Sequence, residues 1–156
     1  MIKCLLTNCY TLKSKNMINS RKIEDLHPKM QELCRQFIAD CLDAGVEVAI
    51  TSTYRDNEYQ NFLYAKGRSD KNSKKVTNAK GGDSIHNYRL AFDFVPLRDG
   101  KPQWNDLDLF KRCGACAMLL GLEWGGKWIS FTDYPHCQYT NGLTLSQLKS
   151  GKIPVL

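Results

Sequence analysis

A segment with helical periodicity runs directly into a segment with strand periodicity, and this junction constrains the fold more than any other feature. Pro28 stands where a first helical turn would begin, and Gly45 follows the last apolar position at helical spacing. Over residues 46–50, apolar and other residues then alternate, which is typical of a strand with one buried face. The chain must therefore combine helices with a sheet. The predicted apolar stripe of the helix consists of Met30, Leu33, Phe37 and Cys41.

The remaining segments mix helical and strand patterns without a regular alternation. A second helix is predicted at about 57–65, a long polar loop at 67–82 and a strand at 90–95. The length of the loop favours a functional flap over a spacer. Asp106 is a candidate N-cap of a third helix, which Gly121 would end. These patterns predict an α+β fold, an antiparallel sheet flanked by helices, instead of a doubly wound sheet.

The length of 156 residues matches one ordinary domain, which we place at residues 20–156. Residues 1–19 lack periodicity and are expected to form an irregular N-terminal extension. Thr7 and Asn8 interrupt the short apolar patch there, so no signal peptide is expected. No stretch approaches the roughly 18 apolar residues of a membrane helix, so no stable membrane association is expected.

Cysteine usage and charge narrow the function classes further. The seven cysteines show no framework spacing, which indicates reduced thiols made in a cytosol. Cys113 and Cys116 form a C-x-x-C pattern, but it lies inside the third predicted helix, which favours buried small side chains over a redox pair. The net charge of +6 predicts attraction to polyanions. Because the basic residues are scattered, solvated loops are favoured over a nucleic-acid groove.

Two of the three histidines lie in segments that can supply a metal site. A catalytic Zn²⁺ commonly takes three nitrogen or oxygen ligands from protein and leaves a fourth position for water. His86, Asp93 and His136 would complete that set if a turn and two neighbouring strands bring them together. Asp133 could then accept a proton from the water that the ion activates. In the alternative interpretation, the imidazoles are surface or core side chains and the aspartates are turn residues.

The same two segments resemble the LAS-type zinc peptidases, specifically the L-alanyl-D-glutamate endopeptidase branch that includes phage endolysins. The family pattern S-x-H-x-x-G-x-A-x-D is matched from Ser84 to Asp93. A second pattern, W-G-G-x-W followed by F-x-D-x-P-H, is matched from Trp124 to His136. The similarity also covers parts of 51–68, so only the predicted N-terminal extension falls outside it.

Two positions depart from the family pattern, and neither removes a ligand or the base. Arg89 stands where the family usually has glycine, and Cys137 where an aromatic residue is common. The resemblance implies that Arg55 faces either the substrate or the oxyanion that develops in amide hydrolysis, a charge that a fixed guanidinium would stabilise. It implies zinc ligands at His86, Asp93 and His136, a general base at Asp133, and substrate-binding residues at Gln60, Ser84 and Trp128.

The resemblance also implies a function and a setting. The expected enzyme is a monomer that uses Zn²⁺ to cut a peptide bond in the stem of bacterial peptidoglycan and does not act on nucleic acid. An endolysin of this kind would accumulate in the host cytoplasm and reach the cell wall after membrane permeabilisation. Three alternatives remain open at this point: a D-alanyl-D-alanine carboxypeptidase or dipeptidase on the same scaffold, a non-catalytic wall- or metal-binding module, and a thiol redox protein built on Cys113 and Cys116.

Overall fold

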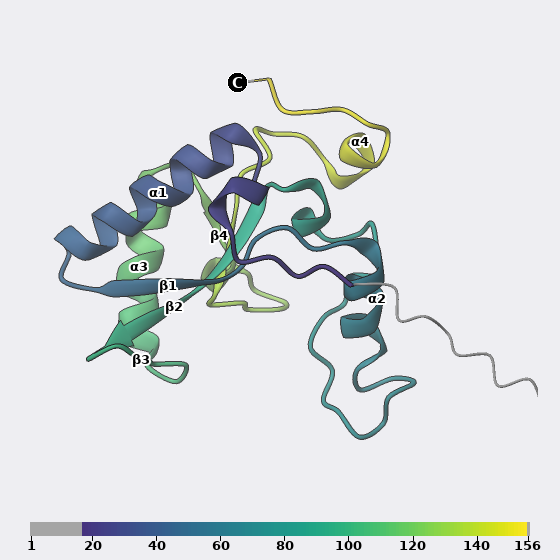
Figure 1. Cartoon of the computed structure of the whole chain (residues 1–156), viewed down its shortest axis with the longest axis horizontal. Helices are drawn as coiled ribbons and strands as arrows, with labels where there is room; N and C mark the ends of the chain where they lie inside the picture. The colour runs from purple at the N-terminus through teal and green to yellow at the C-terminus, as the bar shows by residue number, and fades with distance from the viewer. Residues whose placement is uncertain (1–16, 156) are drawn as a thin grey trace, which may run out of the picture.

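An antiparallel sheet forms the centre of the structure, a computed structural model that describes residues 17–155 (Figure 1). Its strands follow the order β1-β2-β5-β4, and β3 pairs with β2. Cys4, Cys9 and most of the predicted N-terminal extension lie outside the described residues. The strands are β1 (Glu47–Ser52), β2 (Ala91–Arg98), β3 (Lys101–Pro102), β4 (Glu123–Trp124) and β5 (His136–Gln138).

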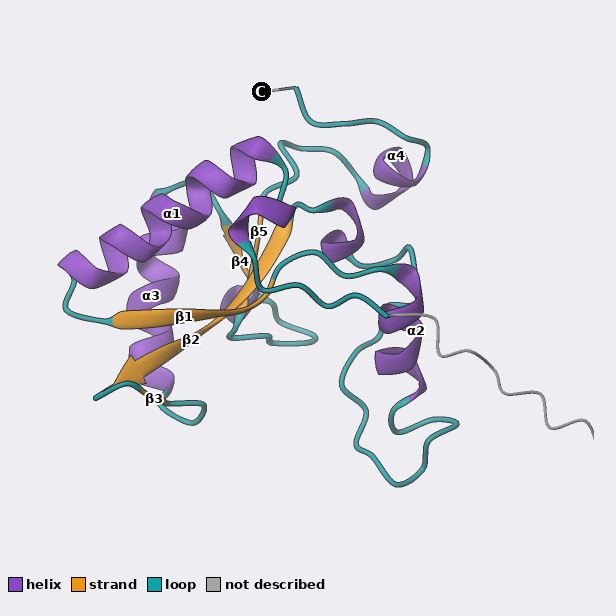
Figure 2. Cartoon of the chain, viewed as in Figure 1, coloured by secondary structure: helices purple, strands orange, loops and turns teal. Residues whose placement is uncertain are grey.

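Two long helices pack together against the sheet, whereas two shorter helices lie apart from them (Figure 2). The α+β prediction is confirmed, and so are the first two predicted helices. The Asp106 carboxylate caps the third helix by accepting a hydrogen bond from the Leu109 amide. None of the helices in the part of the chain that the structure describes has the length and apolarity needed to cross a bilayer. The helices are α1 (Pro28–Asp43), α2 (Asn57–Ala65), α3 (Leu107–Leu119) and α4 (Leu145–Lys149), with short 3-10 turns η1 (Ile23–Asp25), η2 (Ile85–Tyr88) and η3 (Gly125–Lys127).

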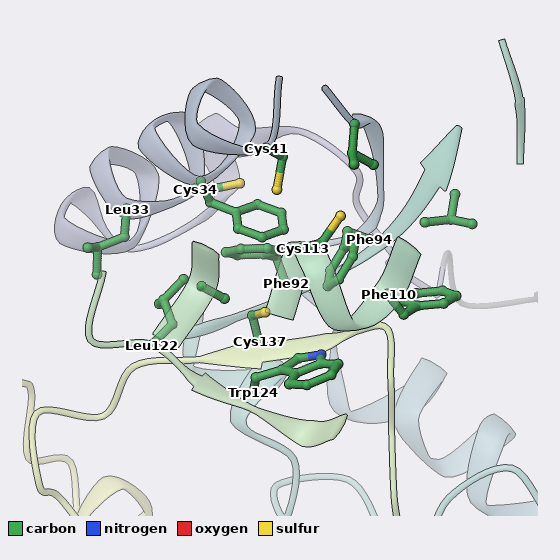
Figure 3. Close-up of a cluster of buried hydrophobic side chains, with 14 of the residues drawn as sticks. Leu33, Cys34, Cys41, Phe92, Phe94, Phe110, Cys113, Leu122, Trp124 and Cys137 are labelled. Carbon is green, nitrogen blue, oxygen red and sulfur yellow. The ribbon is translucent and has the colours of Figure 1, made fainter. Parts of the chain in front are cut away.

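The hydrophobic core lies between α1, α3 and one face of the sheet (Figure 3). The Phe37 ring of α1 packs on Phe92 and Phe94 of β2, with ring centroids 5.2 and 4.9 Å apart. Phe110 of α3 packs on Phe94 at 5.5 Å. Because successive strand residues point to opposite faces, the side chain of Asp93 must point away from this core. The helices therefore cover one face of the sheet, and the other face is left for polar chemistry.

Residues 18–20 run beside the end of β1 and its continuation. Asn19 forms an isolated antiparallel bridge with Arg55, and its side-chain oxygen accepts a hydrogen bond of 2.7 Å from the Ser52 hydroxyl. The amide of Ser20 donates to the Tyr54 carbonyl at 2.9 Å. The predicted boundary between residues 19 and 20 stays a prediction. These contacts nevertheless hold the backbone that carries Arg55.

The long polar loop predicted after α2 occupies the chain between Ala65 and η2, which contains no helix or strand among the described residues. Arg68 stabilises it from inside: its guanidinium stacks on the Tyr64 ring at 3.7 Å and donates to the Thr77 carbonyl at 3.0 Å. At its base, the Tyr88 hydroxyl donates to the Gly82 carbonyl at 2.7 Å. This loop forms one side of the cavity described below.

Candidate metal centre

Strand register brings the three predicted metal ligands to the polar face of the sheet. Asp93 in β2 lies directly opposite His136 in β5, so both side chains project on the same side. Their neighbours Phe92 and Cys137 are also paired and point into the core instead. His86 comes from η2, the turn that leads into β2. A turn followed by a strand thus brings together residues that are seven and fifty positions apart.

The three ligand atoms form a nearly equilateral triangle. His86 Nε2 lies 3.1 Å from Asp93 Oδ1 and 3.2 Å from His136 Nδ1, and the third side, from His136 Nδ1 to Asp93 Oδ1, is 3.2 Å. Tetrahedral coordination with bonds of about 2.0–2.1 Å places neighbouring ligand atoms roughly 3.3 Å apart. The spacing therefore fits a small ion. Among the described residues, His86, Asp93 and His136 are the histidine, cysteine or acidic side chains that lie close enough together to hold a metal ion.

The outer hydrogen bonds of the two imidazoles direct a lone pair toward this triangle. His86 Nδ1 lies 2.7 Å from the Thr53 carbonyl, which can only accept, so Nδ1 carries the proton and Nε2 does not. His136 Nε2 lies 2.9 Å from Gln138 Oε1, and the same argument leaves Nδ1 with its lone pair. Two nitrogen lone pairs and a carboxylate oxygen thus converge. Acceptors that face one another in this way fit a cation between them.

The charges of the cluster agree with that assignment. Burial disfavours ionisation of Asp93, yet the neighbouring His86 and His136 hold its pKa well below the usual range. Burial lowers the pKa of His86, which keeps that ring neutral. Burial also lowers the pKa of His136, but the hydrogen bond with Asp93 and the negative charge of Asp93 outweigh burial, so the pKa of His136 is raised. The site therefore combines an anionic oxygen with imidazole nitrogens, the donor set typical of catalytic zinc.

Arg55 lies just after β1 and binds the second oxygen of the Asp93 carboxylate. Its guanidinium donates to Asp93 Oδ2 at 2.8 Å, to the Ser52 hydroxyl at 3.1 and 3.3 Å, and to Gln60 Oε1 at 3.0 Å. The side chain is only 11% exposed, so these contacts hold it in one orientation. A fixed cation thus lies beside the candidate metal ligands.

Asp133 lies in the loop between η3 and β5. Burial and the negative charge of Asp93 raise its pKa. Within the described residues, its carboxylate forms no hydrogen bond or ion pair, which leaves it free to take up a proton. Its backbone amide donates to the Gly125 carbonyl at 3.0 Å, and a Cβ at Gly125 would lie 2.5 Å from the Asp133 carbonyl oxygen. Only glycine permits this close approach.

A cavity of about 630 Å³ opens over these groups, large enough for part of a peptide. The three candidate metal ligands, Arg55 and Asp133 all line it, as do the predicted substrate-binding residues Ser84 and Trp128. Gln60 is fully buried and is not part of the wall. Its amide bonds Arg55 and the Ala79 carbonyl, so in this structure it supports the guanidinium from behind.

The cavity also contains residues that sequence reasoning missed. Lys66, Trp104 and Leu145 come from three separate segments, and no local pattern marks them. Gln138 could have been found, because it lies two residues after His136 on a strand and must share its face. The sequence therefore indicated the polar side chains that converge in the structure better than the walls around them.

Comparisons with known proteins agree with this geometry. A family model described as D-alanyl-D-alanine carboxypeptidase matches residues 77–139, the segment that carries the three ligands. The peptidoglycan L-alanyl-D-glutamate endopeptidase CwlK of Bacillus subtilis is 36% identical over 80% of this chain and 80% of its own length. The L-alanyl-D-glutamate peptidase of Listeria phage A118 is 30% identical over 81% of this chain, which spans only 41% of that protein.

Two solved structures share the fold at low sequence identity. The L-Ala D-Glu endopeptidase ChiX of Serratia marcescens superposes with a TM-score of 0.58 at 21% identity, over 85% of this chain and 92% of its own. The LD-carboxypeptidase LdcB superposes with a TM-score of 0.57 at 16% identity, over 82% of this chain and 65% of its own. Together with the extent of the match to the Bacillus subtilis protein, these likenesses show that the chain belongs to the LAS-type peptidase family, in its L-alanyl-D-glutamate endopeptidase branch.

Proposed function

We propose that the chain is a zinc-dependent endopeptidase that hydrolyses the bond between L-alanine and D-glutamate in the stem peptide of bacterial peptidoglycan. The observation that carries the proposal is the convergence, in one cavity, of three atoms that could hold a metal, a carboxylate with no partner among residues 17–155, and a fixed guanidinium. The relatives named for this activity support the choice of bond.

His86, Asp93 and His136 would hold the zinc ion. Their donor atoms have the spacing, the protonation states and the mixed nitrogen and oxygen chemistry that zinc favours. When bound, the ion would act as a Lewis acid that polarises the peptide carbonyl and lowers the pKa of a water molecule. Three protein ligands also leave one position open, as catalytic zinc sites require.

Asp133 is proposed as the general base and, afterwards, as the acid. Its carboxylate faces the same cavity as the ligands and has no other partner within the described residues. A raised pKa makes a carboxylate a better proton acceptor near neutral pH. In this role, Asp133 accepts a proton from the attacking water and passes it to the amine of the leaving fragment.

Arg55 is proposed to stabilise the negative charge that develops on the carbonyl oxygen. Its contacts with Ser52, Gln60 and Asp93 fix the guanidinium before substrate arrives, so little reorganisation is needed during the reaction. The bond to Asp93 also places this cation against a ligand. Ser84 and Trp128, in the cavity wall, are proposed to contact the peptide.

The biological setting is proposed on the same basis. The phage relative supports an endolysin that accumulates in the host cytoplasm and acts on the wall after membrane permeabilisation. The net charge of +6 favours contact with an anionic wall. We propose that the enzyme acts as a monomer, without stable membrane association.

Mass spectrometry of fragments released from purified peptidoglycan tests the bond directly. Stem fragments with a new N-terminal D-glutamate or D-isoglutamine are expected, together with L-alanine left on the glycan. An Asp133→Asn variant, with the same shape but no proton acceptor, serves as the inactive control. Release of free D-alanine would instead assign the chain to the carboxypeptidase activity described for the matching family model.

A further inference from the structure

A chain of hydrogen bonds leads from the metal ligand His136 to the exposed rim of the sheet. The His136 ring contacts Gln138 Oε1 at 2.9 Å, and Gln138 Nε2 donates to Glu123 Oε2 at 2.8 Å. Glu123 lies in β4 directly opposite Gln138 in β5, so the strand pairing itself aligns the two side chains. The other oxygen, Glu123 Oε1, accepts from the indole of Trp128 at 2.6 Å.

We propose that Glu123 and Gln138 form a polar relay that fixes the tautomer of His136 and so prepares its Nδ1 for metal binding. The inference deepens the metal site on which the proposed function rests. Neither residue lies among the ligands, and neither is needed as a proton acceptor. Both act through His136 and are therefore positioning residues.

The relay follows from the donor and acceptor inventory of the three side chains. An ionised carboxylate can only accept, so Gln138 must turn its NH₂ group toward Glu123. The Gln138 oxygen is then the atom that faces His136, and it can only accept as well. His136 Nε2 must carry the proton, and Nδ1 is left with the lone pair that points at Asp93 and His86. The carboxylate thus determines, two hydrogen bonds away, which nitrogen can bind a cation.

Trp128 joins this relay to the cavity wall. Its ring lies 5.0 Å from the His136 ring at an interplanar angle of 43°, and its indole nitrogen donates to the same carboxylate that orients Gln138. Glu123 is exposed, whereas His136 is only 7% exposed. The Glu123 carboxylate therefore positions both neighbours of the His136 ring: Gln138, which bonds its edge, and Trp128, which packs near it.

The Glu123→Gln variant changes the pattern of hydrogen-bond donors and acceptors at this position but keeps the size and shape of the side chain. Trp128 and Gln138 each donate to a different oxygen of Glu123, and a glutamine would present an NH₂ group in place of one of these oxygens. Either the indole loses its acceptor or Gln138 flips and presents its NH₂ to His136, which moves the proton to Nδ1 and blocks the metal. Loss of such an outer hydrogen bond typically weakens metal affinity about 10- to 100-fold. Glu47→Gln, an exposed change at the far end of β1, is the charge-matched control.

An exchange of the two side chains separates polarity from mere packing. In Glu123→Gln/Gln138→Glu, the new glutamine accepts from Trp128 and donates to the new glutamate, which accepts from His136 Nε2. The bonds from Trp128 and from His136 Nε2 keep their direction, and only the bond between positions 123 and 138 reverses. Zinc affinity, measured by competition with a chelator, should therefore fall in Glu123→Gln, recover to within a few-fold of wild type in the double variant, and stay unchanged in Glu47→Gln.

Long-range ¹H–¹⁵N NMR of the metal-free protein gives a second measurement that does not depend on catalysis. At a pH above the titration of both imidazoles, His136 should carry its proton on Nε2 in the wild type and in the double variant, and on Nδ1 to a large extent in Glu123→Gln. Wild-type tautomer and zinc affinity in a folded Glu123→Gln protein would overturn the relay. If the wild type cleaved no peptidoglycan, the proposed function would fail, and the tautomer measurement would still decide the relay.

Discussion

The molecule gathers potential metal-binding or redox side chains in two places, and only one of them has the surroundings of a reactive site. On the polar face of the sheet, His86, Asp93 and His136 converge beneath a cavity. On the opposite face, a thiol cluster lies between α1, α3 and the sheet (Figure 3). The thiol cluster consists of Cys34, Cys41, Cys113 and Cys137, all buried and all free, with the half-buried Cys116 beside it.

The difference lies in what surrounds each group. Every candidate ligand has a polar partner that fixes its orientation, such as the Thr53 carbonyl at His86 and Arg55 at Asp93. The thiols are packed among apolar side chains, and burial raises the pKa of Cys34 to about 12. Within the pair on facing helices, the hydrogen bond between the thiols raises the pKa of Cys41 and lowers that of Cys113. The types of residue suggest where a site could be. Polar partners and access to a cavity determine whether the side chains there can react.

Removal of a metal ligand should produce the largest effect of any change. His86→Ala or His136→Ala takes one corner from the triangle, so zinc binding and peptidoglycan hydrolysis should both be lost. Elemental analysis of the purified variants and lysis assays measure the two properties. Chelation of the wild type should reproduce the loss, and added zinc should reverse it. Stoichiometric zinc in a His86→Ala/His136→Ala double variant would place the metal elsewhere and remove the contrast between the two regions.

Asp133→Asn should separate catalysis from metal binding. General-base assistance is typically worth about 10²–10⁴ in rate, so turnover should fall by at least about 100-fold. Zinc content should remain that of the wild type, because Asp133 is not a ligand. Asp93→Asn is the matched comparison, since loss of a ligand charge should weaken zinc binding as well as activity. Near-normal lysis by zinc-loaded Asp133→Asn would exclude Asp133 as the base.

Gly125→Ala should have an intermediate effect. The added methyl group would lie 2.5 Å from the Asp133 carbonyl oxygen and 3.2 Å from the Cβ atoms of Asp133 and His136. Both residues must shift, and small misplacements of catalytic groups can lower rates about 100-fold. We expect a loss of roughly 10- to 100-fold in kcat, with a smaller loss of zinc affinity. Unchanged kinetics would show that this loop moves without consequence for the reaction.

Much of the fold, and the convergence of the three candidate ligands, could be predicted from the sequence, for local reasons. The stripe of α1, its proline start and the carboxylate cap of α3 are short-range features, and each is present in the structure. The candidate ligands were identified because histidines are rare here and the surrounding motifs match a known family. Their roles at a metal remain predictions.

The walls and supports of the site could not be predicted in the same way. Glu123 and Gln138 are neighbours only through the β4–β5 register, and periodicity does not specify which strands pair. Gln60 was expected at the substrate, yet its place on the inner side of α2 buries it behind Arg55. Interactions that depend on how distant segments dock are the ones that sequence patterns leave undetermined.

In the thiol cluster, Cys113→Ala should change stability and leave chemistry intact. Cys113 is fully buried in α3, so the substitution removes a sulfur atom from a packed core. The loss should be about 1–2 kcal/mol in the free energy of unfolding, below the 2–5 kcal/mol typical of a buried leucine. Denaturant titration measures it, and activity per folded molecule should match the wild type. A loss of activity well beyond the unfolded fraction would mean that the two faces of the sheet are coupled.

Cys116→Ser should have the smallest effect, and it tests the redox alternative most directly. The Cys116 thiol makes one weak contact, to the Asp40 carbonyl at 3.8 Å, and a serine hydroxyl can donate to the same carbonyl. The free energy of unfolding should change by no more than about 0.5 kcal/mol. If the C-x-x-C pair took part in the reaction, the exchange of sulfur for oxygen would abolish activity, because serine can form no disulfide. Wild-type lysis by Cys116→Ser, under both reducing and oxidising conditions, is therefore expected. If Cys116→Ser lost lysis but kept its zinc, the result would instead indicate that the thiol cluster takes part in the reaction.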